Sequence, residues 1–198
     1  MQLAILSDTH MPKGARALPA DCVARLQAAD LIVHAGDFVR AEVLYELRAY
    51  GEVVAVHGNV DEEAVRRELP AERIVALPGG VRIALTHDAG PSRGRLERMQ
   101  RRFPDADALV FGHSHMPLHE TKQATGFQLF NPGSPTERRR APRHTMGLAT
   151  VADGRVSFEL IALETAEPSP DGTFGAAEPR SRDAAGPADP EPGAPPTI

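Results

Sequence analysis

The feature that most constrains this chain is the alternation of short apolar runs with longer helical patterns up to residue 69. The apolar runs are LAIL at 3–6, LIVHAG at 31–36 and VVAVHG at 53–58. The helical patterns cover 17–29, 40–50 and 61–69. Such alternation is typical of right-handed β-α-β units, in which parallel strands pack against their crossover helices. The first half of the chain is therefore predicted to form a largely parallel sheet.

The second half of the chain is richer in strands. A hairpin is predicted to turn at Pro78-Gly79-Gly80, and a second at Asp153-Gly154, because such pairs favour tight turns. The segments predicted to form strands there are 73–87, 108–113, 127–134 and 145–163, and an exposed basic helix is predicted over 91–103. A parallel half followed by a strand-rich half indicates two stacked sheets flanked by helices.

The composition changes near Thr165. Residues 165–198 contain eight Pro and four Gly, and their only bulky apolar side chains are Phe174 and Ile198. A segment with so little apolar surface cannot offset the entropy that ordering costs. We therefore expect one domain over 1–164 and a disordered, Pro/Ala/Gly-rich acidic tail over 165–198, which we interpret as inert rather than as a partner-binding segment.

Charge and composition exclude several classes of protein. The net charge is −5, and six Asp or Glu against two Arg in the tail leave the body close to neutral, which argues against a dedicated nucleic-acid binder. No apolar run approaches the ~18–20 residues of a membrane span, and the N-terminal segment lacks the basic and apolar regions of a secretory signal. The one cysteine, Cys22, is expected in a helical core and cannot form a disulfide framework, so a cytoplasmic protein is expected.

Polar side chains stand at the end of five predicted strands, where ligands bind in open α/β sheets. These residues are Asp8, His10, Asp37, Asn59, His87, His113 and His115. Each signal alone has a common alternative, since such an Asp is often a helix N-cap and a His-x-His pair is often two exposed histidines. Their coincidence in order favours one site. Its mixed oxygen and nitrogen donors suit Mn²⁺, Fe²⁺, Co²⁺, Ni²⁺ or Zn²⁺ better than Ca²⁺ or a structural zinc.

The blocks DTH, GD, GN, TH and GHSH, in this order and spacing, resemble the five motifs of the calcineurin-like metallophosphoesterase superfamily. HGNVDE and FNPGSPTERR, in a short chain, are most similar to the small YfcE-like phosphodiesterases. The resemblance covers about residues 1–163. It implies an α/β fold, a four-layer αββα sandwich with two mixed sheets flanked by helices, and a dinuclear metal centre at the strand ends.

The resemblance also implies a set of ligands. One metal would be held by Asp8, His10, Asp37 and His115, and the other by Asp37, Asn59, His87 and His113. Asp37, Asn59 and His87 are thereby assigned to catalysis as well. The implied activity is hydrolysis of a small phosphodiester by a hydroxide that bridges two divalent ions. Manganese is favoured, with nickel, cobalt, iron and zinc as alternatives.

Several neighbouring residues are assigned to the surroundings of the metals. His34 and His57 shortly precede ligands, and each is either a group that orients a ligand or a satisfied core histidine. Asn131 and Ser134 belong to an Asn-Pro-Gly-Ser loop that the family places beside the metals. The basic run 138–140 is interpreted as solvated charge rather than as a phosphate clamp.

The sequence departs from the family at two places. Asp88 follows His87 where relatives commonly carry a second imidazole that helps to bind substrate. Val60 follows Asn59 where many family phosphomonoesterases carry a histidine that protonates the leaving group or binds phosphate. Asp61 is interpreted as the N-cap of a helix over 62–69, so no general acid is assigned. This predicts a preference for diesters with good leaving groups.

Two rival functions accompany this prediction. The first is a non-catalytic interaction scaffold, because a retromer subunit of the same fold acts as an interaction module. The second is a nuclease, which the neutral body disfavours. Assembly into a homo-oligomer is left open by the sequence.

Overall fold

Ten strands form two five-stranded sheets in residues 1–164, the part of the chain that this computed structural model describes. The predicted tail over 165–198 lies outside the described residues. Within residues 1–164, no helix has both the length and the apolar character needed to cross a membrane.

The first sheet has the strand order β10-β9-β1-β2-β3. Its strands are β1 (Gln2–Leu6), β2 (Leu31–His34), β3 (Val53–Ala55), β9 (Thr145–Ala152) and β10 (Arg155–Ala162). β1 pairs in parallel with β2, and β2 with β3, through the helices α1 (Ala20–Ala28) and α2 (Ala41–Tyr50). This confirms the predicted β-α-β units. The β9–β10 hairpin then adds antiparallel to β1.

The second sheet has the strand order β4-β5-β6-β8-β7. Its strands are β4 (Glu72–Ala76), β5 (Arg82–Thr86), β6 (Ala108–Val110), β7 (Leu118–Thr121) and β8 (Gln128–Asn131). β5, β6 and β8 run parallel, with β4 and β7 antiparallel at the edges. The β4–β5 hairpin turns through a short 3-10 helix, Pro78–Gly80, as predicted. β7 was not predicted, and it carries His119 at an exposed edge of the sheet.

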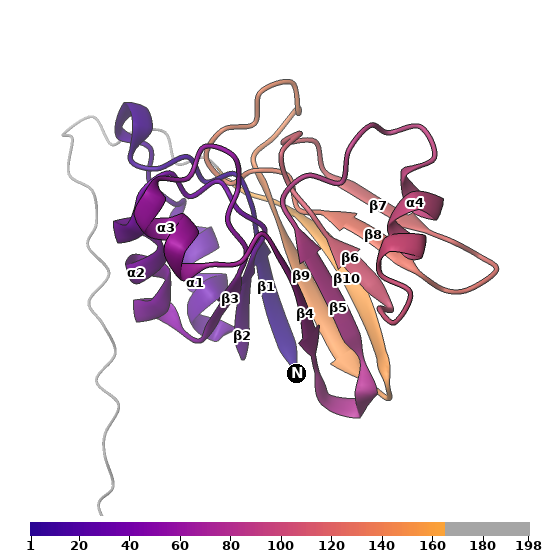
Figure 1. The fold of residues 1–198 in the computed structure, drawn as a ribbon. Helices are drawn as coiled ribbons and strands as arrows, with labels where there is room; N and C mark the ends of the chain where they lie inside the picture. The colour runs from indigo at the N-terminus through magenta and orange to yellow at the C-terminus, as the bar shows by residue number, and fades with distance from the viewer. Residues whose placement is uncertain (165–198) are drawn as a thin grey trace, which may run out of the picture. The chain divides into compact units, whose positions relative to one another are not determined.

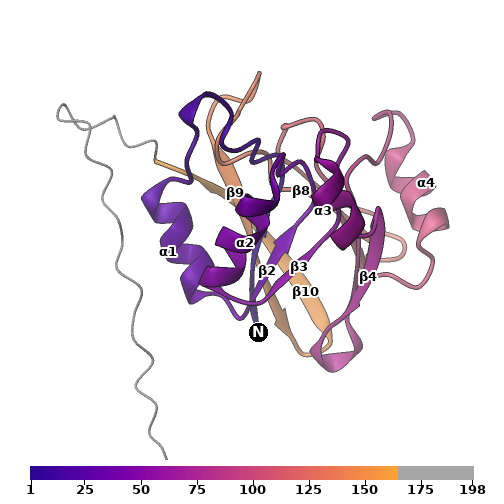
Figure 2. The ribbon, with the colours of Figure 1, turned by 60° about the vertical axis from the view of Figure 1, so that its left-hand side comes forward.

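Helices cover the outer faces of both sheets (Figures 1 and 2). α1, α2 and α3 (Glu63–Glu68) lie against the first sheet, and α4 (Arg95–Arg102) lies against the second. The result is the four-layer αββα arrangement that the resemblance implied. Cys22 is buried in α1, where desolvation raises its pKa to about 12, so its thiol is a core group as expected.

The strands divide their side chains between two kinds of core, because successive side chains point to opposite faces. In β1, Leu3 and Ile5 pack between the sheets, whereas Ala4 and Leu6 pack under the helices. All four are fully buried. This double burial fixes the register of β1, and with it the point where the chain leaves the sheet and the polar residues begin.

Candidate metal centre

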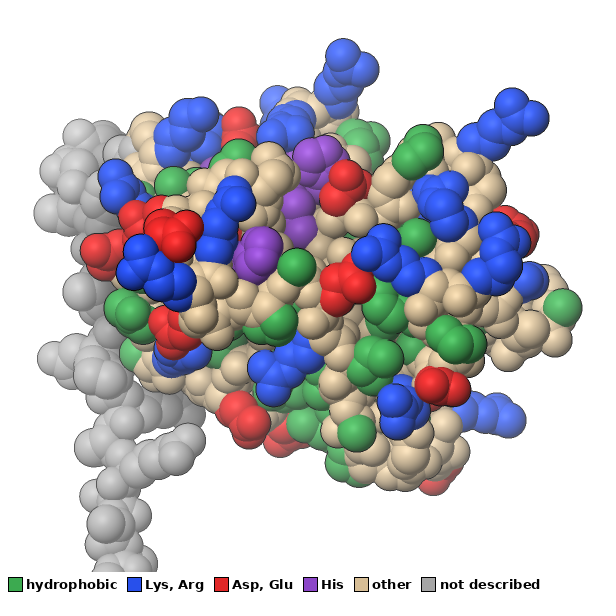
Figure 3. Space-filling view, viewed as in Figure 1, with side chains coloured by type: hydrophobic (Ala, Val, Ile, Leu, Met, Phe, Trp, Pro, Cys, Tyr) green, Lys and Arg blue, Asp and Glu red, His purple; other side chains and the backbone are tan. Residues whose placement is uncertain are grey.

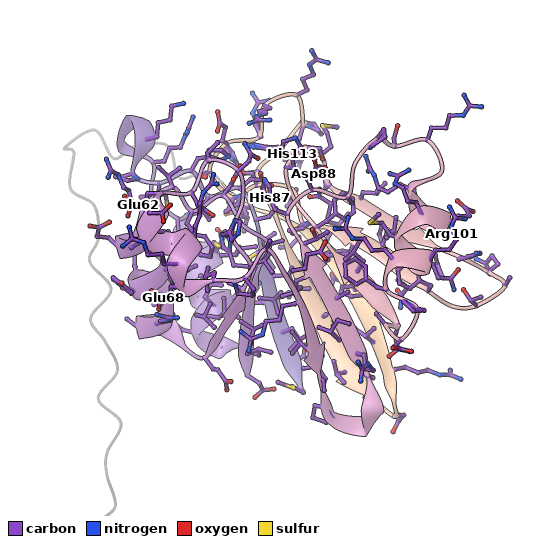
Figure 4. All side chains as sticks on the ribbon, viewed as in Figure 1. Glu62, Glu68, His87, Asp88, Arg101 and His113 are labelled. Atoms are coloured by element: carbon purple, nitrogen blue, oxygen red, sulfur yellow. The ribbon has the colours of Figure 1, made fainter. Side chains whose placement is uncertain are left out.

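Side chains that follow β1, β2 and β3 of the first sheet meet side chains that follow β5 and β6 of the second. Histidine side chains gather in the upper half of the face drawn in Figure 3. Figure 4 shows His87 and His113 close together in the same region, with Asp88 beside them. The backbone N–H of His113 donates a hydrogen bond to Oδ1 of Asp8, 3.1 Å away, which ties the two sheets together at this point.

One group consists of Asp8, His10 and His115, which are all buried and offer atoms within 4.8 Å of one another. Nε2 of His115 lies 3.3 Å from Oδ1 of Asp8, and Nε2 of His10 lies 3.9 Å from the same oxygen. Neither Nε2 atom has a hydrogen-bond partner within residues 1–164. Buried imidazole nitrogens without partners are costly, and their placement around a carboxylate fits a divalent cation.

Asp37 lies between this group and a second one. Its Oδ2 atom lies 3.4 Å from Nε2 of His10 and 3.2 Å from Nε2 of His87. Burial raises the pKa of Asp37, but hydrogen bonding and charge from His87, the Val60 N–H and His10 outweigh burial and bring the pKa to about 2. The side chain is therefore an ionised carboxylate at neutral pH, within reach of imidazoles on both sides.

The second group joins His87 to Asn59 and His113. Oδ1 of Asn59 lies 3.1 Å from Nε2 of His87 and 3.0 Å from Nδ1 of His113. Nδ1 of His87 donates to the Ala35 carbonyl at 2.8 Å, which leaves Nε2 facing the oxygens of Asn59 and Asp37. Burial lowers the pKa of His87 and Asp37 raises it more. A positive charge, from a proton or a metal ion, is therefore favoured at Nε2.

All seven predicted ligands are thus brought together. Asn59 and His113 are exposed, whereas the other five are buried, so the second group opens to solvent and the first is enclosed. Asp8 is also close enough to Asp37 and His87 for those three to form an alternative metal-binding group. The contacts place oxygen and nitrogen donors on both sides of Asp37, which suits two neighbouring cations.

The backbone at the site is held in an uncommon conformation. Five of the seven residues have left-handed φ angles: Asp8 (56°), His10 (45°), Asp37 (63°), His113 (68°) and His115 (59°). This region costs a residue with a Cβ roughly 1–2 kcal/mol. Tight turns directly after the strands produce these angles, and they aim several side chains at one point.

Two positions beside the ligands must be glycine, because a carboxylate of another strand lies too close for a side chain. A Cβ on Gly58 would lie 2.0 Å from Oδ1 of Asp37, and a Cβ on Gly112 would lie 2.7 Å from Oδ2 of Asp8. The glycine in each of the GN and GHSH blocks therefore leaves room for a carboxylate that comes from another strand.

Asp61 is not a helix N-cap, so that interpretation was wrong. α3 begins at Glu63, and the buried Asp61 carboxylate accepts hydrogen bonds from three backbone N–H groups instead. The donors are Asp37 at 3.1 Å, Val39 at 2.7 Å and Gly58 at 2.7 Å. Asp61 thus connects the loop after β2 to the loop after β3. The only sequence feature that could have indicated this contact is the position of Asp61, two residues after Asn59.

Glu137 and Arg16 also contact the site, and sequence reasoning missed both. The Glu137 carbonyl accepts a hydrogen bond from Nδ1 of His115. The Glu137 carboxylate lies 3.7 Å from Nδ1 of His10 and 3.0 Å from the Arg16 guanidinium. Burial lowers the pKa of His115, which favours the neutral imidazole with a lone pair free at Nε2.

His34 combines the two interpretations that the sequence left open. Its Nδ1 accepts the Gly36 N–H at 3.1 Å, which assigns the proton to Nε2 and a hydrogen bond of 3.3 Å to the Thr9 hydroxyl. That hydroxyl contacts the Asp37 carbonyl at 3.4 Å. Burial lowers the pKa of His34 to about 3. His34 is therefore a neutral, satisfied core histidine that also supports the Asp37 backbone.

The remaining predicted residues lie around the centre in different roles. Asn131 is buried and donates to the Gly112 carbonyl at 2.9 Å, and the buried Ser134 hydroxyl donates to the Asp8 carbonyl at 2.7 Å. Both hold the loops that carry ligands. Asp88 is exposed and accepts the Gly90 N–H at 2.7 Å, which closes a tight turn.

An open groove of about 780 Å³ begins at the second group of ligands. It is lined by His57, Gly58, Asn59, Arg66, Ala71, Glu72, Thr86, His87, Asp88 and Arg102. His57 is half-buried there, and its Nδ1 lies 3.2 Å from the Gly58 carbonyl. The arginines 138–140 are exposed, as predicted, and the Arg139 guanidinium donates to the His113 carbonyl at 3.3 Å.

Comparison with known proteins agrees with this geometry. Residues 1–154 match the family model of the calcineurin-like phosphoesterase superfamily domain. A probable metallophosphoesterase from Methanothermobacter thermautotrophicus is 32% identical over 141 residues, which cover 70% of this chain and 80% of the relative. A second, from Methanocaldococcus jannaschii, is 32% identical over 167 residues and covers 83% and 82%.

Solved structures share the fold. A Thermotoga maritima protein is 27% identical with a TM-score of 0.65, covering 82% of this chain and 99% of its own. Entamoeba histolytica Vps29 in complex with zinc is 24% identical with a TM-score of 0.66 and the same coverage. An archaeal phosphodiesterase is 20% identical with a TM-score of 0.62, covering 81% and 100%. The last two likenesses, at this identity, show the fold alone.

Proposed function

The chain belongs to the calcineurin-like phosphoesterase superfamily, and from that membership we propose that it is a phosphodiesterase that uses two divalent metal ions. One observation carries the proposal. Seven polar side chains from five strands converge, and the buried Nε2 atoms of His10 and His115 have no hydrogen-bond partner within residues 1–164. Metal ions bound here would accept the lone pairs of these two Nε2 atoms and so remove the cost of burying them without partners.

The proposed ligands follow the two groups of contacts. The first metal would be held by Asp8, His10, Asp37 and His115, and the second by Asp37, Asn59, His87 and His113. The position of the Asp37 carboxylate supports its proposed role as the bridging ligand, because its Oδ2 atom lies close to imidazoles of both groups. We propose Mn²⁺ as the native ion, with Ni²⁺, Co²⁺, Fe²⁺ and Zn²⁺ as alternatives for this donor set.

The proposed chemistry is direct hydrolysis of a phosphoester. Two divalent ions, when bound, would supply an activated water as nucleophile and positive charge beside the phosphoryl oxygens. Asp37 would be shared by the two metal positions, and Asn59 would contribute a neutral oxygen rather than a third carboxylate. His87 keeps its ring orientation because Nδ1 is bound to the Ala35 carbonyl. Among the seven proposed ligands only Asp8 and Asp37 are carboxylates, so two divalent ions would leave the ligand set with positive charge that attracts an anionic ester.

The proposed preference for diesters comes from Val60. Its side chain is 43% exposed beside Asn59 and has no proton to give to a leaving oxygen. General acid catalysis is typically worth about 10²–10⁴-fold, so its loss favours esters whose leaving group departs without a proton. We propose a small phosphodiester as substrate and, because the single cysteine Cys22 is a buried thiol, a reducing cytoplasm as the location.

The test is hydrolysis by metal-stripped protein after reloading with each metal, with bound metal measured in the same samples. We expect two metals per chain, rapid turnover of aryl diesters, slow turnover of alkyl monoesters and a steep dependence of rate on leaving-group pKa. Faster turnover of alkyl monoesters with a flat dependence would contradict diester preference.

An interaction scaffold is the second candidate function, favoured by the fold shared with Vps29 proteins. It predicts a protein that lacks hydrolytic activity with every metal in the series. A nuclease, the third reading, predicts degradation of long DNA in the same assay. Retention of all seven ligands supports the enzyme over the scaffold, and the near-neutral body of the chain supports a small substrate over DNA.

A further inference from the structure

Arg66 is a fixed cation on the wall of the groove. Its guanidinium donates through Nε to the Asp61 carbonyl at 2.7 Å and through Nη2 to the Asn59 carbonyl at 2.5 Å. The side chain comes from α3 and lines the groove together with Asn59 and His87. Two hydrogen bonds to backbone carbonyls hold the guanidinium in one place, which lowers the entropy that binding a ligand would cost.

The charge of Arg66 is not neutralised within the described part of the chain. No carboxylate of residues 1–164 forms an ion pair with it, whereas Arg102, the other arginine of the groove, pairs with Glu72 at 2.5 Å. A guanidinium has five N–H donors, and the two carbonyls use two of them, which leaves three for a ligand. Arg66 therefore offers both charge and free donors beside Asn59.

We propose that Arg66 binds a phosphoryl oxygen of the substrate in this groove and stabilises its negative charge. The proposal rests on the proposed function and deepens it, because it assigns an anion-binding residue that neither the motifs nor the family resemblance supplied. A planar guanidinium matches the geometry of phosphate oxygens. The Arg66 guanidinium binds the carbonyls of Asn59 and Asp61, the residues on either side of Val60, so it brings charge next to the position that lacks an imidazole, although it cannot act as a proton donor.

A purely structural role has a different signature. If Arg66 only held the Asn59 backbone in place, its replacement would weaken the second metal position and leave phosphate binding to the metal-saturated protein unchanged. An anion-binding role leaves metal content unchanged and weakens the binding of phosphate. Metal affinity and phosphate affinity, measured separately, therefore distinguish the two roles.

The experiment compares full-length wild type with Arg66→Gln, Arg66→Lys and Arg67→Gln. Arg67 is the matched control, because it is adjacent on the same helix, exposed, and paired with Glu63 at 3.1 Å. Metal affinity is measured by titration, and the inhibition constant of inorganic phosphate is measured at saturating metal with an aryl diester as substrate.

We expect Arg66→Gln to raise the phosphate inhibition constant and KM by about 10- to 100-fold, as for loss of a charge-assisted hydrogen bond, with two metals still bound. Arg66→Lys should recover part of the loss, and Arg67→Gln should match wild type. An unchanged inhibition constant in Arg66→Gln would overturn the proposal. If wild type bound no metal and hydrolysed no ester, the proposed function itself would fail, and the role of Arg66 with it.

Discussion

Asp37 makes more contacts at the centre than a single metal position requires. One carboxylate oxygen faces His10 and His87, and the other accepts the Val60 N–H at 3.1 Å. We therefore expect Asp37→Ala to lower metal binding at both positions and kcat/KM by at least about 10³-fold, since both groups lose their shared ligand. Metal content and turnover measured on the same sample check this.

The control variants for Asp37 each remove an imidazole from one group only. His115→Ala should mainly empty the first position and His87→Ala the second, so each should retain close to one metal per chain. Two metals and near-normal turnover in Asp37→Ala would show that the carboxylate does not bridge.

Glu137 acts on His10 through its carboxylate, 3.7 Å from Nδ1, with Arg16 holding the carboxylate from the other side. Groups that orient a metal-binding histidine are typically worth 10- to 100-fold in metal affinity. We expect Glu137→Gln to weaken the first metal position by about tenfold and to leave the second unchanged. Arg140→Gln, an exposed change in the same loop, is the control, and equal affinities in both variants would contradict this role.

At the scale of elements, two loops support the residues that carry the proposed ligands. Asp61 in the loop 58–62 binds the backbone N–H groups of Asp37, Val39 and Gly58, next to the second group. The loop 134–137 contacts the first group, through Ser134 to the Asp8 carbonyl and through the Glu137 carbonyl to His115. Because the Asp61 loop also holds Asp37, the ligand that the two groups share, changes in it should affect both positions, whereas changes in the loop 134–137 should mainly affect the first.

Asp61→Ala tests the first of these loops. It leaves three N–H groups, two of them fully buried, without their acceptor, and hydrogen bonds to charged groups are worth about 1.5–3 kcal/mol each. Allowing for water that replaces part of this, we expect a fall in melting temperature of about 5–10 °C and weaker binding of both metals, since Asp37 belongs to both positions. Asp105→Ala, an exposed change, should alter neither, and a normal melting temperature in Asp61→Ala would contradict the role.

The sequence predicted the strands whose residues are mostly apolar and missed β7, whose residues are mostly polar. β7 reads Leu-His-Glu-Thr, lies at a sheet edge and exposes three of its four residues, so it carries no apolar period. Asp61 was misread because an Asp before a helical pattern gives the same local signal whether it caps the helix or binds a distant loop. Glu137 and Arg66 contact the site only through the tertiary structure, so the sequence around each of them gives no indication of this contact.

At the scale of the whole molecule, three apolar cores hold the layers together. One core lies between the sheets and two lie under the helices, and all three are built from apolar side chains that bind no metal. We expect the chain to stay folded after a chelator removes metal, because these cores remain. Metal at about 100 times its Kd adds roughly 2.7 kcal/mol per site, so reloading should raise the melting temperature by several degrees.

The control for the chelator experiment is Asp37→Ala, whose melting temperature should not respond to metal. Loss of secondary structure on chelation would show instead that folding depends on the ions.

Removal of residues 165–198 should leave turnover and melting temperature nearly unchanged. The segment has only Phe174 and Ile198 as bulky apolar residues, so its sequence offers little surface to pack on the domain. Thermal melting of the truncated and full-length proteins checks this. A fall of several degrees on truncation would show that the segment contributes to stability.

The left-handed backbone at five ligand positions has an evolutionary consequence. Strained turns persist only while selection for hydrolysis maintains them, since ordinary residues in ordinary conformations would be more stable there. When that selection is relaxed, substitutions that dismantle the centre are favoured by stability itself, and the sheets beneath are untouched. A lineage of such proteins can lose its chemistry while keeping its fold, and its surface is then free to acquire another use.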